Sequence, residues 1–271
     1  MIHDEMRELQ KYLTPPPTPL FKKETPLIID EETKKIRSIK MSITLTSQQK
    51  QKVFEPMFKY FETEEILEYF KEVVTKIPDA IFYKPASSSG KYHNSQQIGR
   101  YGQLIHIYMF SDILNMLLDL EYNKYKFPDL IERDLMRCVP VLHDMCKYGV
   151  FGTRTHTTSK HPLMAKEKLI KINNQKNFNH PLEKDQLQML CEMCERHSGE
   201  WNIWKDKTII YGTDGYWGEF NYETETGEME KPQNDRDILI HECDMLASRT
   251  FLTYVIPDDL MKLFETNIKI E

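Results

Sequence analysis

The segment from Gln103 to about Leu120 is apolar on almost every side, and this pattern limits the fold more than any other part of the chain. A helix without a polar face has to be buried by neighbouring elements. Apolar residues recur at helical spacing in further segments, at 53–61, 66–74, 134–148, 162–169, 185–197 and 234–251. We therefore expect an all-α helical bundle built around the helix at 103–120.

Two segments do not fit the helical pattern. Residues 1–47 are polar and contain the Pro-rich run Thr14–Pro26, which cannot form a helix. We interpret them as an N-terminal arm that precedes one domain at 48–271. Residues 208–222 combine β-branched and aromatic residues with glycines, which predicts a small β-hairpin insertion.

Composition excludes several classes of partner. The chain has 271 residues with a formal net charge of -6 and a pI near 5.9, which disfavours binding to long duplex DNA. No apolar run is long enough to span a bilayer, and no export signal is recognisable, so we expect no membrane association and a cytoplasmic location. The five cysteines form no disulfide framework, and we expect free thiols. The oligomeric state stays open.

Six ionisable residues lie on or at the ends of these apolar helices. They are His106, His143, Asp144, His161, His197 and Asp244. Burying several imidazoles and carboxylates is costly unless they are paired or bind a cation. The set therefore predicts a metal site on several converging helices.

The ligand types indicate the metal and its chemistry. Imidazole and carboxylate suit Mn, Fe, Ni, Co, Zn or Mg, and one or two divalent ions can bind if a carboxylate bridges them. Hydrolysis of a phosphate ester is the reaction that such a site serves best. If the helix continues past His143, Lys147 lies one turn further on the same face, where its ammonium can reach the phosphate.

The order of these residues resembles the H…HD…H…H…D pattern of the HD-domain phosphohydrolase superfamily. The loop KPASSSGKYHNSQQIGRYGQLIH, residues 84–106, and the following LHDMCK at 142–147 are similar to one branch of that superfamily. The branch includes the bacterial YhaM-type 3′-5′ exoribonucleases and many small phage and bacterial HD hydrolases. The resemblance covers about residues 54–253 and implies an HD-domain fold.

The resemblance also implies a role for each site residue. His106, His143, Asp144 and Asp244 would hold a first ion, and Asp144 would bridge to a second ion held by His161 and His197. Asp144 and Lys147 would be the catalytic residues, with Lys147 on the scissile phosphate. Where some two-metal relatives have a second His, this chain has Ser198.

Other polar residues are further candidates for this site. Lys91, His93 and Arg100 precede the first metal-binding His and are candidates to bind the substrate. His93 could also donate to a phosphate or leaving group. Cys191 and Cys194 form a single CxxC pair, for which we expect a place in the core and no zinc site.

Together these features predict a metal-dependent phosphohydrolase that acts on a nucleotide or short single-stranded oligonucleotide. One alternative keeps the metals and makes the substrate a nucleoside mono- or triphosphate. Another alternative is a non-catalytic module that senses a nucleotide and recruits a partner through the arm.

Overall fold

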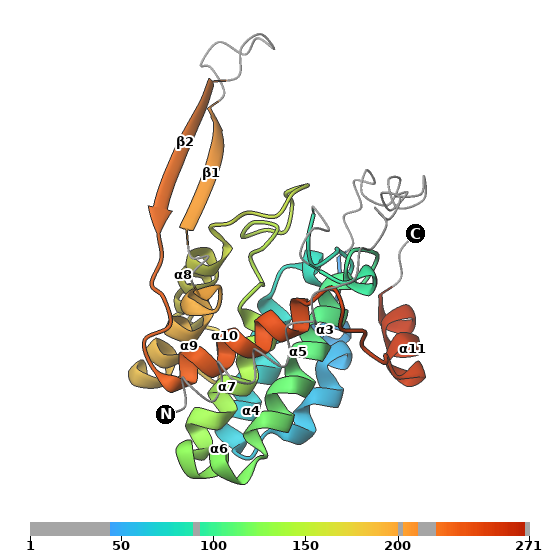
Figure 1. Ribbon diagram of the computed structural model, residues 1–271, viewed down its shortest axis with the longest axis vertical. Coiled ribbons are helices and arrows are strands. Elements are labelled where there is room, and N and C mark those ends of the chain that lie inside the picture. The colour runs from blue at the N-terminus through green and yellow to red at the C-terminus, as the bar shows by residue number, and fades with distance from the viewer. Residues whose placement is uncertain (1–43, 89–92, 200–202, 211–220, 269–271) are drawn as a thin grey trace, which may run out of the picture. The chain divides into compact units, whose positions relative to one another are not determined.

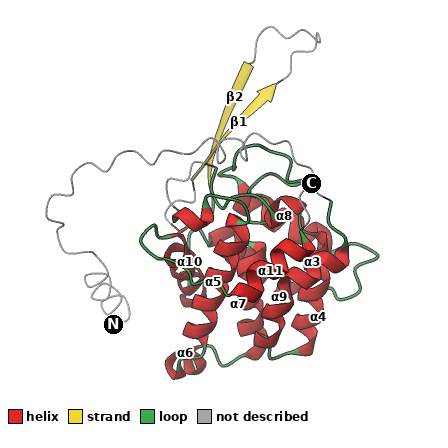
Figure 2. Cartoon of the chain, turned by 90° about the vertical axis from the view of Figure 1, so that its right-hand side faces the viewer, coloured by secondary structure: helices red, strands yellow, loops and turns green. Residues whose placement is uncertain are grey.

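The computed structural model describes residues 44–88, 93–199, 203–210 and 221–268. Helices, red in Figure 2, make up most of this described part, in agreement with an all-α fold. The expected arm at 1–47 lies outside the described residues up to residue 43, and Ser47 already belongs to the first described helix. None of the described helices combines the length and the apolar character needed to cross a membrane.

The described α-helices are α3 (Ser47–Phe54), α4 (Glu64–Val73), α5 (Gly102–Leu118), α6 (Glu121–Lys126), α7 (Leu130–Leu142), α8 (His161–Asn173), α9 (Lys184–Arg196), α10 (Asp235–Ser248) and α11 (Asp258–Asn267). Short 3-10 helices lie at Glu55–Tyr60, Val74–Lys76, Asp79–Phe82 and Ser95–Gln97. Two strands, β1 (Ile203–Ile210) and β2 (Asn221–Glu228), pair antiparallel with Ile203 opposite Glu228. Residues 211–220 between them lie outside the described residues, so the hairpin insertion at 208–222 stays a prediction.

Helix α5 lies at the centre of the described helices, as its sequence predicts. Most of its side chains are buried, with Leu104, Ile107 and Phe110 fully covered, and only Met116 near its C-terminal end is exposed, at 62%. It packs against α7 and α10, and α9 in turn packs against α7, α8 and α10 (Figure 1). The ends of these packed helices carry the polar residues that the sequence singles out.

Helix α7 ends earlier than the sequence pattern predicts. We expected it to continue through residue 148, but it stops at Leu142 and residues 143–148 form tight turns. The ring of His143 explains this end, because its Nδ1 lies 3.0 Å from the carbonyl oxygen of Pro140, which would accept from Asp144 in a continuing helix. The side chain therefore replaces the next backbone hydrogen bond of the helix.

The start of helix α4 is fixed by a carboxylate from α7. Asp134 is fully buried, and its Oδ2 accepts from the backbone nitrogen of Thr63 at 2.6 Å and of Glu62 at 3.0 Å. Arg137 Nη1 donates to Asp134 Oδ1 at 2.7 Å. The contact satisfies backbone donors at the beginning of α4 and ties α4 to α7.

The C-terminal part differs from the sequence pattern in two places. Helix α10 ends at Ser248, so Phe251 lies beyond it and is 62% exposed. Helix α11 was not predicted from the sequence, although Pro257 before the acidic pair Asp258 and Asp259 is a typical helix start. It packs against α3, and Leu260 and Phe264 on its apolar face are buried.

Gly102→Ala is expected to destabilise the protein by about 2 kcal/mol or more. A Cβ at Gly102 would lie only 2.1 Å from the backbone oxygen of Gln97, so one backbone segment would have to move. Gly99→Ala is the matched control, because a Cβ there meets nothing within 4 Å. Urea denaturation of both variants measures the effect, and equal midpoints would show that the 97–102 turn adapts freely.

Candidate metal centre

Five segments of the fold bring the predicted metal-ligating residues together. His106 lies on α5, Asp244 on α10, and His161 is the first residue of α8. His143 and Asp144 directly follow α7, and His197 directly follows α9. His106, His143, Asp144 and His197 are at most 3% exposed, so the centre is buried.

The first group of ligand atoms comes from His106, His143 and Asp244. His106 Nε2 lies 3.0 Å from Asp244 Oδ1 and 3.4 Å from His143 Nε2. His143 Nε2 lies 3.7 Å from the same Asp244 oxygen and 3.4 Å from Asp144 Oδ2. Two imidazole nitrogens and two carboxylate oxygens thus face one small volume.

The second metal-ligand group consists of His143, Asp144 and His197, and His161 lies beside it at the other oxygen of Asp144. Asp144 Oδ1 is 2.8 Å from His161 Nε2 and 3.8 Å from His197 Nε2. The two imidazole nitrogens are 3.3 Å apart. Asp144 therefore has one oxygen toward each group, which is the arrangement of a bridging carboxylate.

In three of the histidine rings, the Nδ1 atom, which faces away from the centre, contacts a backbone oxygen. His143 Nδ1 lies 3.0 Å from the Pro140 oxygen, His161 Nδ1 2.7 Å from Thr158 and His197 Nδ1 2.8 Å from Cys194. A carbonyl oxygen can only accept, so Nδ1 carries the proton in each ring. In the neutral ring, Nε2 then presents a lone pair to the centre, which is the form that binds a metal ion.

Several buried atoms of the centre lack a hydrogen bond. They are Asp144 Oδ1, Gln103 Oε1 and His106 Nδ1. Asp144 Oδ1 lies 2.8 Å from His161 Nε2, but both atoms present lone pairs when that ring is neutral, so the short distance does not make a hydrogen bond. A cation between such atoms removes their repulsion. The residues of this centre can therefore hold a metal ion.

Both carboxylates of the centre are kept ionised. Burial by itself raises the pKa of Asp144, but the charges of Lys147 and His143 outweigh it and hold the pKa well below its usual range. In Asp244 the hydrogen bond with His106 and the charge of His143 outweigh burial, and the pKa is lowered. Ionised carboxylates are the form that binds a cation.

The histidines differ in their protonation. Burial lowers the pKa of His197 to about 3, and the charge of His143 acts in the same direction. Burial also lowers the pKa of His106 more than the hydrogen bond with Asp244 raises it. Burial opposes protonation of His143 too, but the charge of Asp144 outweighs it and the pKa is raised. The lowered pKa values of His106 and His197 favour the neutral ring, which is the form that metal ligation requires.

Lys147 reaches the centre by a different geometry from the one predicted. Because α7 ends at Leu142, Lys147 does not lie one helical turn beyond His143 on a common face. Its backbone nitrogen donates to the Asp144 oxygen in a tight turn, and its Nζ lies 2.5 Å from Asp144 Oδ2. The side chain is 13% exposed, so its ammonium contacts the centre and is partly accessible to solvent.

Gln103 is a residue of the centre that the sequence analysis missed. It is fully buried on α5, one turn before His106, and its Nε2 donates to Asp144 Oδ2 at 3.1 Å. It therefore orients the Asp144 carboxylate. A polar residue inside an otherwise apolar helix, one turn before a candidate ligand, was a signal that could have identified it.

The segment after His197 is held by His241, which the sequence places one turn before Asp244. His241 Nδ1 lies 2.7 Å from the backbone oxygen of His197, and its ring covers Gly199. Gly199 has φ +60, and a Cβ there would lie 2.3 Å from the His241 ring. The contact helps to position His197 from the neighbouring helix α10.

The three candidate substrate-binding residues have different positions. Lys91 lies outside the described residues. His93 packs against His106, with ring centroids 5.3 Å apart, and burial with the nearby charge of Lys147 lowers its pKa to about 3. Arg100 is exposed, and its Nη2 donates to Tyr101 Oη at 2.6 Å. The described contacts bring only His93 to the centre, and a role for Lys91 or Arg100 in binding substrate stays a prediction.

Cys191→Ser and Cys194→Ser are each expected to leave bound metal unchanged. Both thiols are buried, and burial raises the pKa of Cys191 to about 12, so the thiolate that zinc requires is disfavoured. Neither belongs to a metal-ligand group among the described residues. Metal analysis by mass spectrometry is the measurement, and a loss of one equivalent of zinc in either variant would contradict this assignment.

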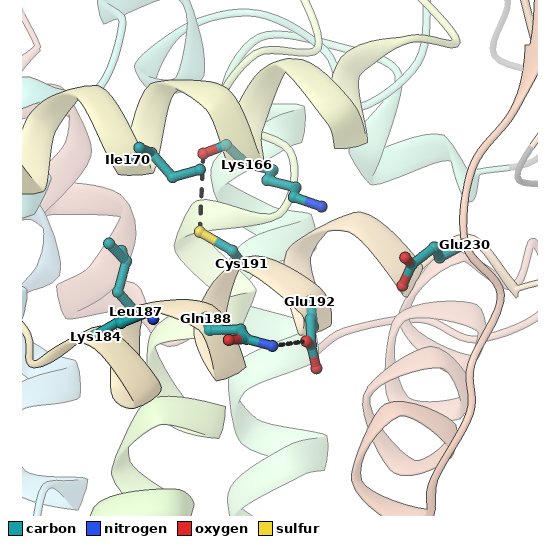
Figure 3. Close-up of a pocket in the computed structure, with 8 residues that line it drawn as sticks. All are labelled: Lys166, Ile170, Lys184, Leu187, Gln188, Cys191, Glu192 and Glu230. Carbon is teal, nitrogen blue, oxygen red and sulfur yellow. Dashed lines mark hydrogen bonds between the residues drawn. The ribbon is translucent and has the colours of Figure 1, made fainter.

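Figure 3 shows a pocket that is separate from this centre. It is lined by residues of α8 and α9 and by Glu230, namely Lys166, Ile170, Lys184, Leu187, Gln188, Cys191, Glu192 and Glu230. No residue of the metal centre lines it. Cys191 Sγ donates to the Lys166 backbone oxygen at 3.8 Å, so this thiol is used in packing the two helices.

Comparisons with known proteins return no match. No family model, no curated protein and no solved structure is significantly similar to this chain.

Proposed function

We propose that the chain is a metal-dependent phosphohydrolase of the HD-domain superfamily that acts on a nucleotide or short single-stranded oligonucleotide. The observation that carries the proposal is the position of Asp144. One of its oxygens lies 2.8 Å from His161 Nε2, and the other lies 3.4 Å from His143 Nε2 and 2.5 Å from Lys147 Nζ. A carboxylate shared between two sets of histidines and a lysine fits two cations and an anionic substrate.

The donor set fits divalent Mn, Fe, Ni, Co, Zn or Mg. His106, His143, Asp144 and Asp244 would hold one ion, and Asp144, His161 and His197 a second. Such ions, when bound, lower the pKa of a coordinated water and neutralise charge on phosphate oxygens. The second set has fewer protein ligands, which leaves room there for water or substrate.

The protein residues supply positioning and charge. Gln103 and Lys147 both contact Asp144 Oδ2, so they set the orientation of the bridging carboxylate. Lys147 contacts Asp144 and is 13% exposed, and its ammonium can move from Asp144 to a phosphate oxygen. In that position it would stabilise the charge that grows on the phosphate during hydrolysis.

Metal analysis followed by a hydrolysis screen tests the proposal. The full-length protein is first analysed for bound metal, and it is then assayed with added Mn²⁺ on nucleoside monophosphates, nucleoside triphosphates and short ribo- and deoxyribo-oligonucleotides. We expect turnover on at least one class and loss of turnover with EDTA. Bound nucleotide without any turnover would favour the sensing alternative, and a protein that retains no divalent metal would refute the metal centre.

A further inference from the structure

His93 lies beside the centre without belonging to it. Its ring packs nearly perpendicular to His106, at 81° with centroids 5.3 Å apart. It is part of neither of the metal-ligand groups found among the described residues. A neutral histidine ring donates a hydrogen bond from one nitrogen and accepts one at the other. What His93 can do at the centre depends on which of its two nitrogens carries the hydrogen.

The neighbouring Gln97 is held in one orientation. It is fully buried, and its Nε2 donates at 2.8 Å to the backbone oxygen of Ala247 on α10. A carbonyl oxygen cannot donate, so the amide nitrogen has to face Ala247 and the amide oxygen has to face the other way. The backbone of Gln97 is also fixed, since its oxygen accepts from Ala86 at 2.8 Å and its nitrogen donates to Asn94.

The amide oxygen of Gln97 determines the tautomer of His93. Gln97 Oε1 lies 2.7 Å from His93 Nδ1, and because this oxygen can only accept, Nδ1 must carry the hydrogen. The neutral ring then has a lone pair at Nε2. This nitrogen can accept a hydrogen bond and cannot donate one. In this form His93 therefore does not donate to a phosphate or a leaving group, which differs from the role that the sequence suggests.

We propose that His93 Nε2 accepts a hydrogen bond from an O–H group of the molecules bound next to His106. The donor is either the attacking water or the 2′-hydroxyl group of a ribose in the substrate. The proposal rests on the proposed function, because both donors belong to a phosphate ester hydrolysis. It makes His93 a positioning residue, with Gln97 and Ala247 as the groups that fix its tautomer.

The tautomer can be measured without any turnover. In long-range ¹H–¹⁵N spectra of histidine-labelled full-length protein, the ¹⁵N shifts of the two ring nitrogens distinguish the tautomers. The His93 signals are assigned by their absence in His93→Asn. We expect a neutral ring with the hydrogen on Nδ1, and a hydrogen on Nε2 would overturn the proposal even if the protein is an active hydrolase.

Turnover of matched ribo- and 2′-deoxyribo-oligonucleotides then identifies the donor. His93→Asn keeps a group near Nδ1 but does not reach the position of Nε2, and we expect it to lose roughly tenfold in turnover, as for one lost hydrogen bond. His93→Gln places an acceptor near Nε2 and should retain most of the activity. The exposed His156→Asn is the control.

The two substrates separate the two donors. If His93→Asn lowers turnover equally on both substrates, the hydrogen-bond donor is the attacking water. If it lowers turnover only on the ribo-substrate, the donor is the 2′-hydroxyl group of the sugar. Full activity of His93→Asn on both substrates would overturn the proposal. If the wild-type protein hydrolyses none of the substrates, the proposed function fails, and the spectra still decide the tautomer.

Discussion

Asp144→Asn should abolish hydrolysis and reduce metal binding at the same time. The two oxygens of Asp144 face two different sets of histidines, at 2.8 Å from His161 Nε2 and 3.4 Å from His143 Nε2. A neutral amide presents one oxygen and one NH₂ group, so it cannot serve both sets. We expect turnover to fall roughly 10³-fold or more, as for loss of a central catalytic group.

Asp134→Asn is the matched control for this prediction. Asp134 is also a fully buried carboxylate and lies on α7, the helix that precedes Asp144, but it contacts the start of α4 and Arg137. Its variant should lower the midpoint of urea denaturation and leave metal content unchanged. Metal analysis, turnover and denaturation of both variants decide the matter. Full metal content in Asp144→Asn would show that Asp144 is not a shared ligand.

Lys147→Ala should keep the metals and lose roughly 10² in turnover, because the lost cation stabilises charge that develops mainly in the transition state. The sequence alone also allows Lys147 to pair only with a surface carboxylate. Such an ion pair contributes about 0 to 1 kcal/mol to stability, and its loss would leave turnover nearly normal. Its partner is instead Asp144, which is 1% exposed, so the lysine competes with a cation for that carboxylate. Metal affinity in Lys147→Ala should therefore not decrease.

Lys171→Ala is the control, because it removes the same charge from an exposed position on α8. Turnover is measured on a mononucleotide and on a short oligonucleotide at saturating Mn²⁺, together with metal titration. Equal losses on both substrates would mean that Lys147 contacts only the scissile phosphate. Normal turnover of Lys147→Ala with full metal would remove the residue from the catalytic site.

Much of the fold follows from local patterns in the sequence. The helices α5, α8, α9 and α10 lie close to the ranges that the apolar spacing predicts, because a 3.6-residue period requires only local residues and a buried face. The predicted end of α7 was wrong by several residues, since the helix stops at Leu142. There the ring of His143 forms a hydrogen bond with the carbonyl oxygen of Pro140. A side-chain contact of this kind does not appear in the apolar spacing of the sequence.

The sequence by itself also determined the candidate ligands, since His and Asp residues on apolar helices are costly to bury without a cation. Only the tertiary structure decided how they act. Gln103 reaches Asp144 across 41 positions, and Gln97 reaches Ala247 across 150. These contacts orient the Asp144 carboxylate and the Gln97 amide that faces His93. They depend on which backbone oxygens and side chains meet when distant helices pack, and no local pattern in the chain contains that information.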